Sequence, residues 1–596
     1  MNDKTEVQQE PAAPTIKGAL RRVIMAAEPP RAMIGAGVII SLLPIAATLA
    51  MPILVQQLIA AMGSPGSDVA SVLGHPFTIG IVILLAAGAL IDGFAQYTLA
   101  LAGLKMGLNL RLKMFGDIIR RPIEDFEDDE SGGLVSRLTT DTQVISGLLT
   151  KQVSGLVSGV LLLLGSLAIL VYLDAELTLM IFGIIFFAFV LMAPMIFAMN
   201  RITQAVNDNT AAFSAYATRI FGNIALVKAY TAEAAETDRM AGRLDAVFRE
   251  RKRASMVEAA LGPANGLTLT IAMLAILTYG GFRVSAGTLE IGTLTAFILY
   301  LFNIVAPLIQ LSVFSVQFQA SRGAASRIAP LLEDARSIDQ MGAGPRLAAS
   351  VTASAVRAVP QGKASLVLDQ VKFGYGPVTE EPVIAVNRLE FAPGTQTVLT
   401  GESGCGKSTL FSLLERFYEP WEGQITFGNE PIAEFDVAQW RRMIGYVPQS
   451  APLLRGTIRD NVVYGSEGEA NDEAVRAALE AANCTSFLDA MPGGLDTDVG
   501  EAGTLVSGGQ KQRLAIARLF YRDPRILLLD EATANLDSEN QAAVFAVLER
   551  LMDDRITIMS THRIEAIGRH ANIISLSRTS PDVTERQSPA LAEMGA

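Results

Sequence analysis

Six long apolar segments fill the first half of the chain and constrain its fold more than any other feature. Each is long enough to cross a hydrocarbon core of roughly 30 Å as a helix, and each contains almost no charge, because a charge in lipid is costly. The segments are Ala32–Ala61, Phe77–Leu104, Gln152–Leu173, Leu177–Met199, Ala259–Phe282 and Ile291–Gln317. The whole chain is 50% hydrophobic, which is high for a soluble protein. The sequence therefore predicts an all-α membrane domain of six helices.

The basic residues predict the orientation of this domain. The loop Met62–Pro76 and the turn Asp174–Glu176 contain no Lys or Arg, and Arg283 is the only basic residue near an outer loop. The loops that follow the second and fourth segments are long and rich in Lys and Arg. The positive-inside rule places these two loops and both termini in the cytoplasm.

The two long loops also have a helical pattern, so we expect the membrane helices to continue beyond the bilayer. Turns near Ile123–Ser131 and Ser214–Asn223 would end these extensions and contact the second half of the chain. The alternative is that both are ordinary solvated loops.

The N-terminus contains two different parts. Met1–Pro14 is polar and acidic and lacks the pattern of a cleaved signal peptide, so we expect a disordered cytosolic tail. Ile16–Ala27 is amphipathic, with Lys17, Arg21 and Arg22. It is either a helix on the membrane surface or a short connecting helix.

A few polar residues lie inside the apolar segments. A carboxylate there is by default a functional hypothesis, so Asp92 is a candidate for a substrate or ion site. Hydrogen bonding between helices is the alternative, and we favour it for the amides. These amides are Gln56, Gln57, Gln96, Asn265, Asn303 and Gln310.

The second half of the chain contains a phosphate-binding sequence. From Ser365 onward short apolar runs alternate with helical stretches, which indicates an α/β domain. An apolar strand, Thr395–Thr400, comes before a glycine-rich loop, and a helix, Leu410–Phe417, comes after it. The loop is Gly401, Glu402, Ser403, Gly404, Cys405, Gly406, Lys407, Ser408 and Thr409.

This loop fits the P-loop pattern. Its glycines let backbone N–H groups surround phosphates, and the helix start adds partial positive charge. Lys407 would reach the β- and γ-phosphates of ATP, and Ser408 would bind Mg²⁺.

A second motif, Arg525–Glu531, is an apolar strand that ends in two acids. After a P-loop, such a strand predicts a nucleotide hydrolase. Asp530 would hold Mg²⁺ and Glu531 would polarise the attacking water, because phosphoryl transfer needs mainly positioning and neutralised charge.

Between these motifs lies Val506–Arg513, which resembles the signature sequence of ATP-binding-cassette (ABC) proteins. It places glycines at a helix start, so it is a second phosphate-binding device. In that family the signature of one subunit closes over ATP held by the P-loop of the other, and two ATP molecules are sandwiched in a head-to-tail dimer. The resemblance assigns this role to Ser507, Gly508, Gly509 and Gln510.

The resemblance implies further roles. Tyr375 matches the aromatic residue that stacks on adenine, and Gln449 the glutamine that senses Mg²⁺ and faces the membrane domain. Asp537, in Ala534–Asp537, matches the loop that links the two ATP sites, and His562 the histidine that contacts the γ-phosphate. Thr497–Glu501 resembles the loop by which exporters contact the cytoplasmic helices of the partner.

The resemblance covers nearly the whole chain, and six spans fused ahead of the cassette resemble the exporter branch (type IV fold). Three positions depart from the family pattern. Val506 stands where Leu is usual, Ala502 where Arg is common, and Arg219 where many relatives have Glu. None of them removes a catalytic group.

We therefore expect a half-transporter, most simply a homodimer, that uses ATP and Mg²⁺ to export an amphipathic or lipid-like substrate. We expect it in the plasma membrane of a bacterium, with the ATPase domain in the cytoplasm. An importer built on the exporter fold and a heterodimer remain alternatives, and the six spans argue against a non-transport ATPase. The net charge of −12 argues against nucleic acid as a partner.

The predicted order of domains follows from these motifs. It is a tail over residues 1–15, the membrane domain over 16–320, a linker over 321–362, the nucleotide-binding domain over 363–580 and a C-terminal tail over 581–596.

Overall fold

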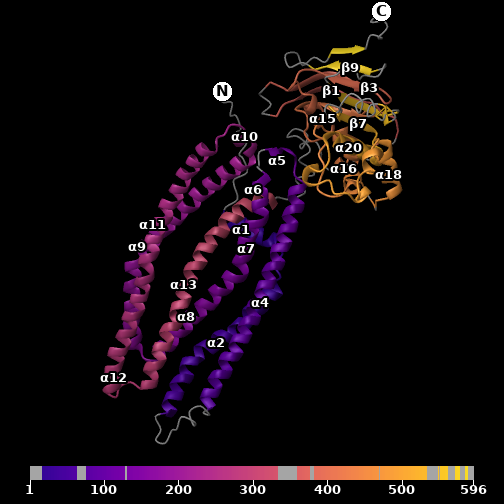
Figure 1. Cartoon of the computed structure of the whole chain (residues 1–596). Coiled ribbons are helices and arrows are strands. Elements are labelled where there is room, and N and C mark those ends of the chain that lie inside the picture. The colour runs from indigo at the N-terminus through magenta and orange to yellow at the C-terminus, as the bar shows by residue number, and fades with distance from the viewer. Residues whose placement is uncertain are drawn as a thin grey trace, which may run out of the picture. The chain divides into compact units, whose positions relative to one another are not determined.

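The computed structural model shows two compact units. The first contains Met1–Ile118 and Gly132–Leu332, and the second contains Ile119–Ser131 and Glu333–Ala596 (Figure 1). The residues that the structure describes are 16–62, 76–127, 131–332, 357, 359–360, 362–375, 381–466, 468, 470–532, 546, 548–549, 551–552, 554–561, 571–576 and 584–587.

The first unit is all-α, as predicted. Its chain order begins with α1 (Ile16–Ala26), α2 (Arg31–Met62), α4 (Pro76–Ile119), α6 (Ser131–Ser136), η1 (Arg137–Asp141), α7 (Thr142–Gly147), η2 (Leu148–Gln152) and α8 (Val153–Leu173). It continues with α9 (Ala175–Gly222), α10 (Ile224–Ala229), α11 (Glu233–Ala275), η3 (Ile276–Gly280), α12 (Gly281–Ser285), α13 (Ile291–Ile328) and η4 (Ala329–Leu332). Of the η segments, η1, η2 and η3 are π-helical and η4 is a 3₁₀ helix.

Five helical stretches in the described part of the chain are long and apolar enough to cross a membrane. They are Arg31–Met62, Pro76–Ile119, Gly133–Leu173, Ala175–Gly222 and Glu233–Ser285. The sixth predicted span lies in α13, where the described apolar stretch Ile291–Ile304 is shorter.

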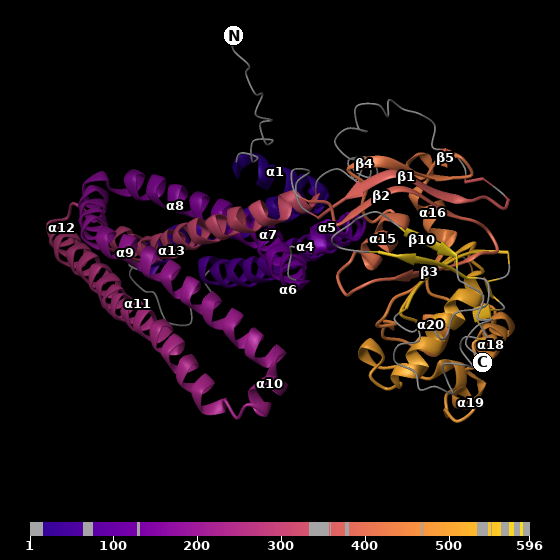
Figure 2. The same cartoon turned by 90° about the horizontal axis from the view of Figure 1, so that it is seen from above.

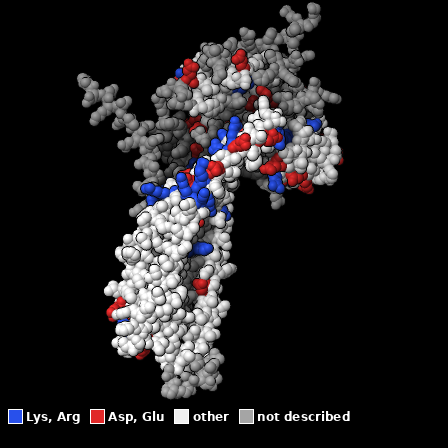
Figure 3. Space-filling view, turned by 60° about the vertical axis from the view of Figure 1, so that its left-hand side comes forward, with Lys and Arg blue, Asp and Glu red and all other residues white. Residues whose placement is uncertain are grey.

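The helices also continue beyond the apolar segments, as expected. The N-terminal part of α11 has exposed ion pairs three or four residues apart, such as Arg249–Asp245 at 2.5 Å and Arg253–Glu250 at 2.6 Å. Such pairs are typical of helix surfaces in water. On the face shown in Figure 3, Lys and Arg gather at one end of the apolar body of this unit.

One of the two predicted turns was placed too early. Ser214–Gly222 is still helical, and the chain first breaks at Asn223, whose φ of −118° and ψ of 31° are not helical. The reversal is completed after α10, and α11 begins at Glu233. No residue between Ser214 and Phe221 interrupts a helix, so it continues to Gly222. The first turn contains a short helix, α5 (Glu124–Glu127).

Two groups of long helices pack closely. One contains α2, α8 and α13, which pack on one another, and the other is the hairpin of α9 and α11 (Figures 1 and 2). Small residues allow close packing. A Cβ on Gly37 of α2 would lie 2.6 Å from Leu99 of α4, and one on Gly280 would lie 2.4 Å from Leu294.

Two of the amides form the expected hydrogen bonds between helices. Gln56 of α2 donates to Thr293 Oγ1 of α13 at 3.0 Å, and Asn303 of α13 donates to the carbonyl of Thr48 at 3.4 Å. Pro52 removes the helical donor for this carbonyl, so the second bond restores a partner to it. The apolar face of α1 packs in a core with α4 and α13, which favours a connecting helix.

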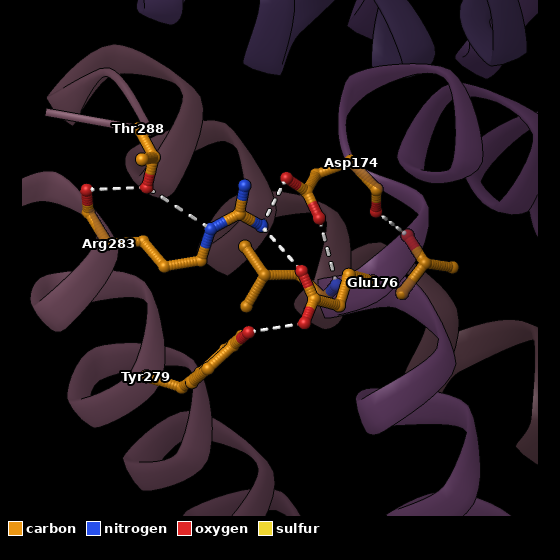
Figure 4. Close-up of polar contacts among 7 residues, drawn as sticks. Asp174, Glu176, Tyr279, Arg283 and Thr288 are labelled. Atoms are coloured by element: carbon orange, nitrogen blue, oxygen red, sulfur yellow. Dashed lines mark hydrogen bonds and ion pairs between the residues drawn. The ribbon is translucent and has the colours of Figure 1, made fainter. Parts of the chain in front are cut away.

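A polar cluster ties together two turns of this unit (Figure 4). Asp174 lies between α8 and α9, caps α9 by accepting the N–H of Leu177 at 2.9 Å, and pairs with Arg283 at 2.6 Å. Arg283 also lies 3.5 Å from Glu176, whose other oxygen accepts the Tyr279 hydroxyl at 2.5 Å. The side chains of Asp174 and Arg283 are largely buried, so the contacts within this cluster take the place of their contacts with water.

We expect Asp174→Ala to lower the stability of the membrane domain by about 1–3 kcal/mol, because it removes a helix cap and leaves Arg283 with one fewer partner. The midpoint of thermal unfolding of the purified protein, detected as loss of the monodisperse peak, measures this change in stability. Asp174→Asn keeps the cap and loses the charge, so it should fall between wild type and Ala. Equal midpoints for Ala and wild type would contradict the assignment.

The second unit is α/β, as predicted. An antiparallel sheet in the order β2-β1-β4-β5 contains β1 (Leu366–Phe373), β2 (Ile384–Phe391), β4 (Glu422–Phe427) and β5 (Glu430–Pro431). A second sheet in the order β10-β9-β3-β8-β7-β6 contains β3 (Gln396–Thr400), β6 (Ile444–Val447), β7 (Ile526–Asp530), β8 (Ile556–Ser560), β9 (Ala571–Ser575) and β10 (Thr584–Gln587). All its neighbours are parallel except β10, which comes from residues expected to form the C-terminal tail.

Short helices connect the strands of this unit. They include α15 (Lys407–Leu414), α16 (Val437–Arg442), α17 (Ile458–Val462), α18 (Asp472–Ala481), α19 (Thr485–Leu488) and α20 (Gly508–Arg522). Strands β7 and β8 are buried along their whole length, as expected for central parallel strands.

Candidate nucleotide-binding site

The candidate site lies at the carboxyl edge of the parallel sheet. Strand β3 leads into the P-loop, and its neighbour β8 ends at Ser560. Next to β8, β7 ends with Asp530 opposite Ser560. Because parallel strands end on the same side, the register alone brings the glycine-rich loop and the acids to one place, which is where open α/β sheets bind ligands.

The P-loop has a backbone that requires glycine. Gly401, Gly404 and Gly406 have φ angles of 150°, 80° and 101°, which L-residues rarely adopt. A Cβ on Gly401 would lie 2.5 Å from the carbonyl oxygen of Leu576, whereas a Cβ on Gly404 would meet nothing within 4 Å. The loop is thus packed on one side and open on the other, which fits a cradle for phosphates at the start of α15.

Lys407 is held against this loop. Its Nζ donates to the carbonyls of Gly401 at 2.7 Å and Glu402 at 3.2 Å, and the residue is only 8% exposed. The two carbonyls fix the ammonium group beside the open side of the loop. A buried ammonium beside backbone N–H groups suits a phosphate, which supplies the opposite charge.

A chain of hydrogen bonds connects the two acids. Asp530 accepts the hydroxyl of Ser408 at 3.1 Å on one oxygen and that of Ser560 at 2.6 Å on the other. The backbone N–H of Glu531 donates to Ser560 Oγ at 3.1 Å, and Gln449 Nε2 donates to the Glu531 carboxylate at 2.8 Å. Glu531 has a φ of 47°, an uncommon conformation that is typical of functional sites.

Ser560 is a candidate site residue that the sequence analysis did not identify. The structure places its hydroxyl between both acids. Only its position at the end of an apolar strand could have indicated this role. The oxygens of Ser408 and Asp530 are the ligand type that Mg²⁺ prefers, so this pair fits the cation.

Tyr375 presents a partly open ring beside the P-loop. Its hydroxyl lies 3.1 Å from Thr409 Oγ1, and Phe373 and Tyr418 make edge-to-face contacts with the ring. The residue is 54% exposed. Two ring neighbours and one hydrogen bond fix the ring while leaving surface for stacking on a base.

The signature forms the start of α20. Ser507 Oγ accepts the N–H of Gln510 at 3.3 Å, and the Gln510 side chain accepts the N–H of Ser507 at 2.8 Å, which is a capping box. A Cβ on Gly508 would meet nothing within 4 Å. Among the described residues, no hydrogen bond joins Ser507–Gln510 to Gly401–Thr409. Asp537 and His562 lie outside the described residues.

The interior behind the site is poorly solvated. Burial raises the pKa of Glu415, which follows α15, to about 7, and Arg441 opposes this shift. Burial, and then the charges of Asp530 and Glu415, raise the pKa of the Tyr446 hydroxyl. Low solvation strengthens electrostatic interactions at the edge of the sheet.

Binding and cleaving a nucleoside triphosphate is what a P-loop beside two linked acids can perform, so the second unit is a P-loop nucleotide hydrolase joined to a helical membrane domain. A family model described as ABC transporter transmembrane region matches residues 34–308, and one described as ABC transporter matches residues 386–534.

The chain is 31% identical over 546 residues to the multidrug resistance ABC transporter ATP-binding and permease protein of Lactococcus lactis subsp. cremoris, covering 92% of this chain and 89% of that protein. It is 31% identical over 519 residues to the ATP-dependent lipid A-core flippase of Thiobacillus denitrificans, covering 87% and 86%. The structure resembles that of a bacterial Atm1-family ABC exporter with ATP bound, with a TM-score of 0.75, 25% identity, and 94% and 95% of the two chains covered.

The chain therefore belongs to the ABC transporter family. It is a multi-pass membrane protein that binds ATP and couples its hydrolysis to transport.

We expect Ser560→Ala to lower steady-state ATP hydrolysis by about 10- to 100-fold, because a hydrogen bond to a carboxylate contributes about 1.5–3 kcal/mol. Phosphate release by the purified protein measures this. Thr557→Val is the matched control on the same strand, because Thr557 Oγ1 is buried without a hydrogen-bond partner in the described structure. An equal loss in both variants would show that the strand, and not the hydroxyl, is responsible.

Proposed function

We propose that two copies of this chain form an ATP-driven exporter that carries an amphipathic or lipid-like substrate out of the cytoplasm of a bacterium. The observation that carries this proposal is the chain of hydrogen bonds from Ser408 through Asp530 and Ser560 to Glu531 and Gln449, in one polypeptide with the membrane helices. The names of two relatives, a multidrug transporter and a lipid A-core flippase, support a substrate of this class.

In this proposal the residues of the site bind the nucleotide, hold Mg²⁺ and position the attacking water. The P-loop amides and Lys407 bind the phosphates, and Tyr375 stacks on the adenine. Ser408, Asp530 and Gln449 hold Mg²⁺, which neutralises charge on the phosphates when bound. Glu531 accepts the proton of the attacking water, and its hydrogen bond from Gln449 orients it. His562 and Asp537 complete the site beside the γ-phosphate and between the two ATP sites.

One observation supports a dimer. The signature Ser507–Gln510 begins a helix and has open space at Gly508, but it makes no hydrogen bond to the P-loop within the described chain. A homodimer is the simplest arrangement, in which each signature closes over the ATP of the other chain and closure drives alternating access.

We expect Glu531→Gln to keep ATP binding and to lose steady-state hydrolysis by about 10²- to 10⁴-fold, because the amide cannot accept the proton. Binding of a fluorescent ATP analogue and release of phosphate, measured on one preparation, separate the two effects. Glu480→Gln on the exposed face of α18 is the control with the same change of charge. Substantial turnover in Glu531→Gln would sink the role given to Glu531.

We expect mixed dimers of a Lys407→Ala chain and a Ser507→Ala chain to regain part of the wild-type hydrolysis, because one of their two sites is intact if the signature acts across the dimer. Co-expression with two tags and tandem purification isolates these dimers. Wild type mixed with the double variant Lys407→Ala/Ser507→Ala is the control, and it should be inactive. Activity in this control but not in the first mixture would mean that the signature serves its own chain.

The alternatives have separate tests. Uptake of substrate into inside-out vesicles on addition of ATP supports export, and ATP-driven release would identify an importer. The masses of the proteins that purify together with the tagged chain distinguish a homodimer from a heterodimer.

A further inference from the structure

One cavity in the membrane domain contains an ionisable group. It has a volume of about 380 Å³ and lies among α2, α4, α8 and α13. Its lining is mostly apolar, with side chains such as Ile45, Leu84, Leu85 and Leu162. Of the described residues that line it, Asp92 is the one with a titratable side chain. Such a cavity, apolar with a few polar groups, is typical of small-molecule sites.

Asp92 lies near the middle of the span Phe77–Leu104, and its hydrogen bonding does not explain its presence there. Gln96 Nε2 donates to Asp92 Oδ2 at 2.6 Å, but Gln96 is one turn further along the same helix. Asp92 therefore does not link α4 to another helix. Gln56 and Asn303, in contrast, each donate a hydrogen bond to a neighbouring helix. No Lys, Arg or His in the part of the chain that the structure describes pairs with this carboxylate.

Two hydroxyls of the cavity already donate within their own helix. The hydroxyls of Ser41 and Thr48 donate to the carbonyls of Val38 and Pro44 in their own helix, at 2.7 and 2.8 Å, so their lone pairs remain for a ligand. Pro44 and Pro307 line the cavity, and each removes the helical donor for the carbonyl four residues earlier.

Gln310 completes the polar side of the cavity. A Cβ on Gly159 of α8 would lie 2.8 Å from Gln310 Oε1, so glycine at this position lets the amide of α13 lie against α8. The cavity thus combines a carboxylate, an amide and hydroxyl groups with apolar walls. A positive charge with an apolar body complements this lining, whereas an anion would meet the like charge of Asp92.

We propose that this cavity is a substrate subsite in which Asp92 binds the charged group of an amphipathic organic cation. The inference rests on the proposed export function and names the substrate class. The apolar walls from α2, α4 and α8 would bind the organic body, and the Asp92 carboxylate would supply the counter-charge that lipid cannot.

The test uses two probes of one shape and opposite charge, tetraphenylphosphonium and tetraphenylborate. Their equilibrium binding to the full-length protein in lipid nanodiscs is measured without ATP, with binding to empty nanodiscs subtracted. We expect wild type to bind the cation, and Asp92→Asn to weaken this binding about tenfold or more, because a charge pair in a poorly solvated site exceeds about 1.4 kcal/mol. Binding of the anion should not weaken.

Two further variants keep the result interpretable. Asp92→Glu retains the charge and should retain the preference for the cation. Asp117→Asn makes the same charge change further along α4, outside the cavity lining, and should bind the cation like wild type. Each variant is compared at equal monodispersity, so a failure to fold is seen directly.

Three results would overturn the inference. Equal cation affinity in wild type and Asp92→Asn, including no specific binding in either, would remove the role of the charge. Equal loss of both probes would make Asp92 structural. Unchanged cation binding with an altered dependence of ATP hydrolysis on proton concentration would make Asp92 a coupling-ion site. Loss of ATP hydrolysis in wild type would count against the proposed function alone, because the binding measurement contains no ATP.

Discussion

The nucleotide site depends on the register of three parallel strands. Strand β8 lies between β3 and β7, so Ser560 ends beside both the P-loop strand and Asp530. Side chains alternate between the faces of a sheet, and a slip of one residue would turn Asp530 away from the hydroxyls that hold it. The buried apolar strands fix the register, so the packing of the sheet core determines the geometry of the acids.

The backbone turns sharply at Glu531, where strand β7 ends. Directly after β7 the backbone turns to a φ of 47°, which costs of order 1–2 kcal/mol for a residue with a side chain. Ser560 stabilises the turn through the N–H of Glu531, and Gln449 holds the carboxylate. The strained residue is therefore held from both sides, by β8 and by the loop after β6.

The sequence predicted those parts of the site whose chemistry is local. The P-loop, the strand before it and the acids at the end of β7 follow from residues that are close together in the chain. Ser560 could not be predicted in the same way, because its role depends on the pairing of β8 with β7, and pairing between strands is not visible in either strand alone. The turn after α9 was misplaced for a related reason, since a run of helix-forming residues gives no stop before Gly222 and Asn223. The folds of both units were predictable because apolar length and alternation reflect burial directly.

Asp530 and Asp92 show two outcomes for a carboxylate placed away from water. A buried charge is costly unless other groups replace the hydration it has lost. Asp530 receives hydroxyl donors from α15 and β8, one on each oxygen, and it lies beside the P-loop and Lys407. Asp92 receives one amide donor from its own helix and faces a cavity in which no described lining residue carries a positive charge. The environment of Asp530 is complete within its unit apart from the cation that it fits, whereas that of Asp92 lacks positive charge. A cationic ligand supplies the charge that this mid-membrane carboxylate lacks, and this is the physical reason for assigning Asp92 to a transported cation.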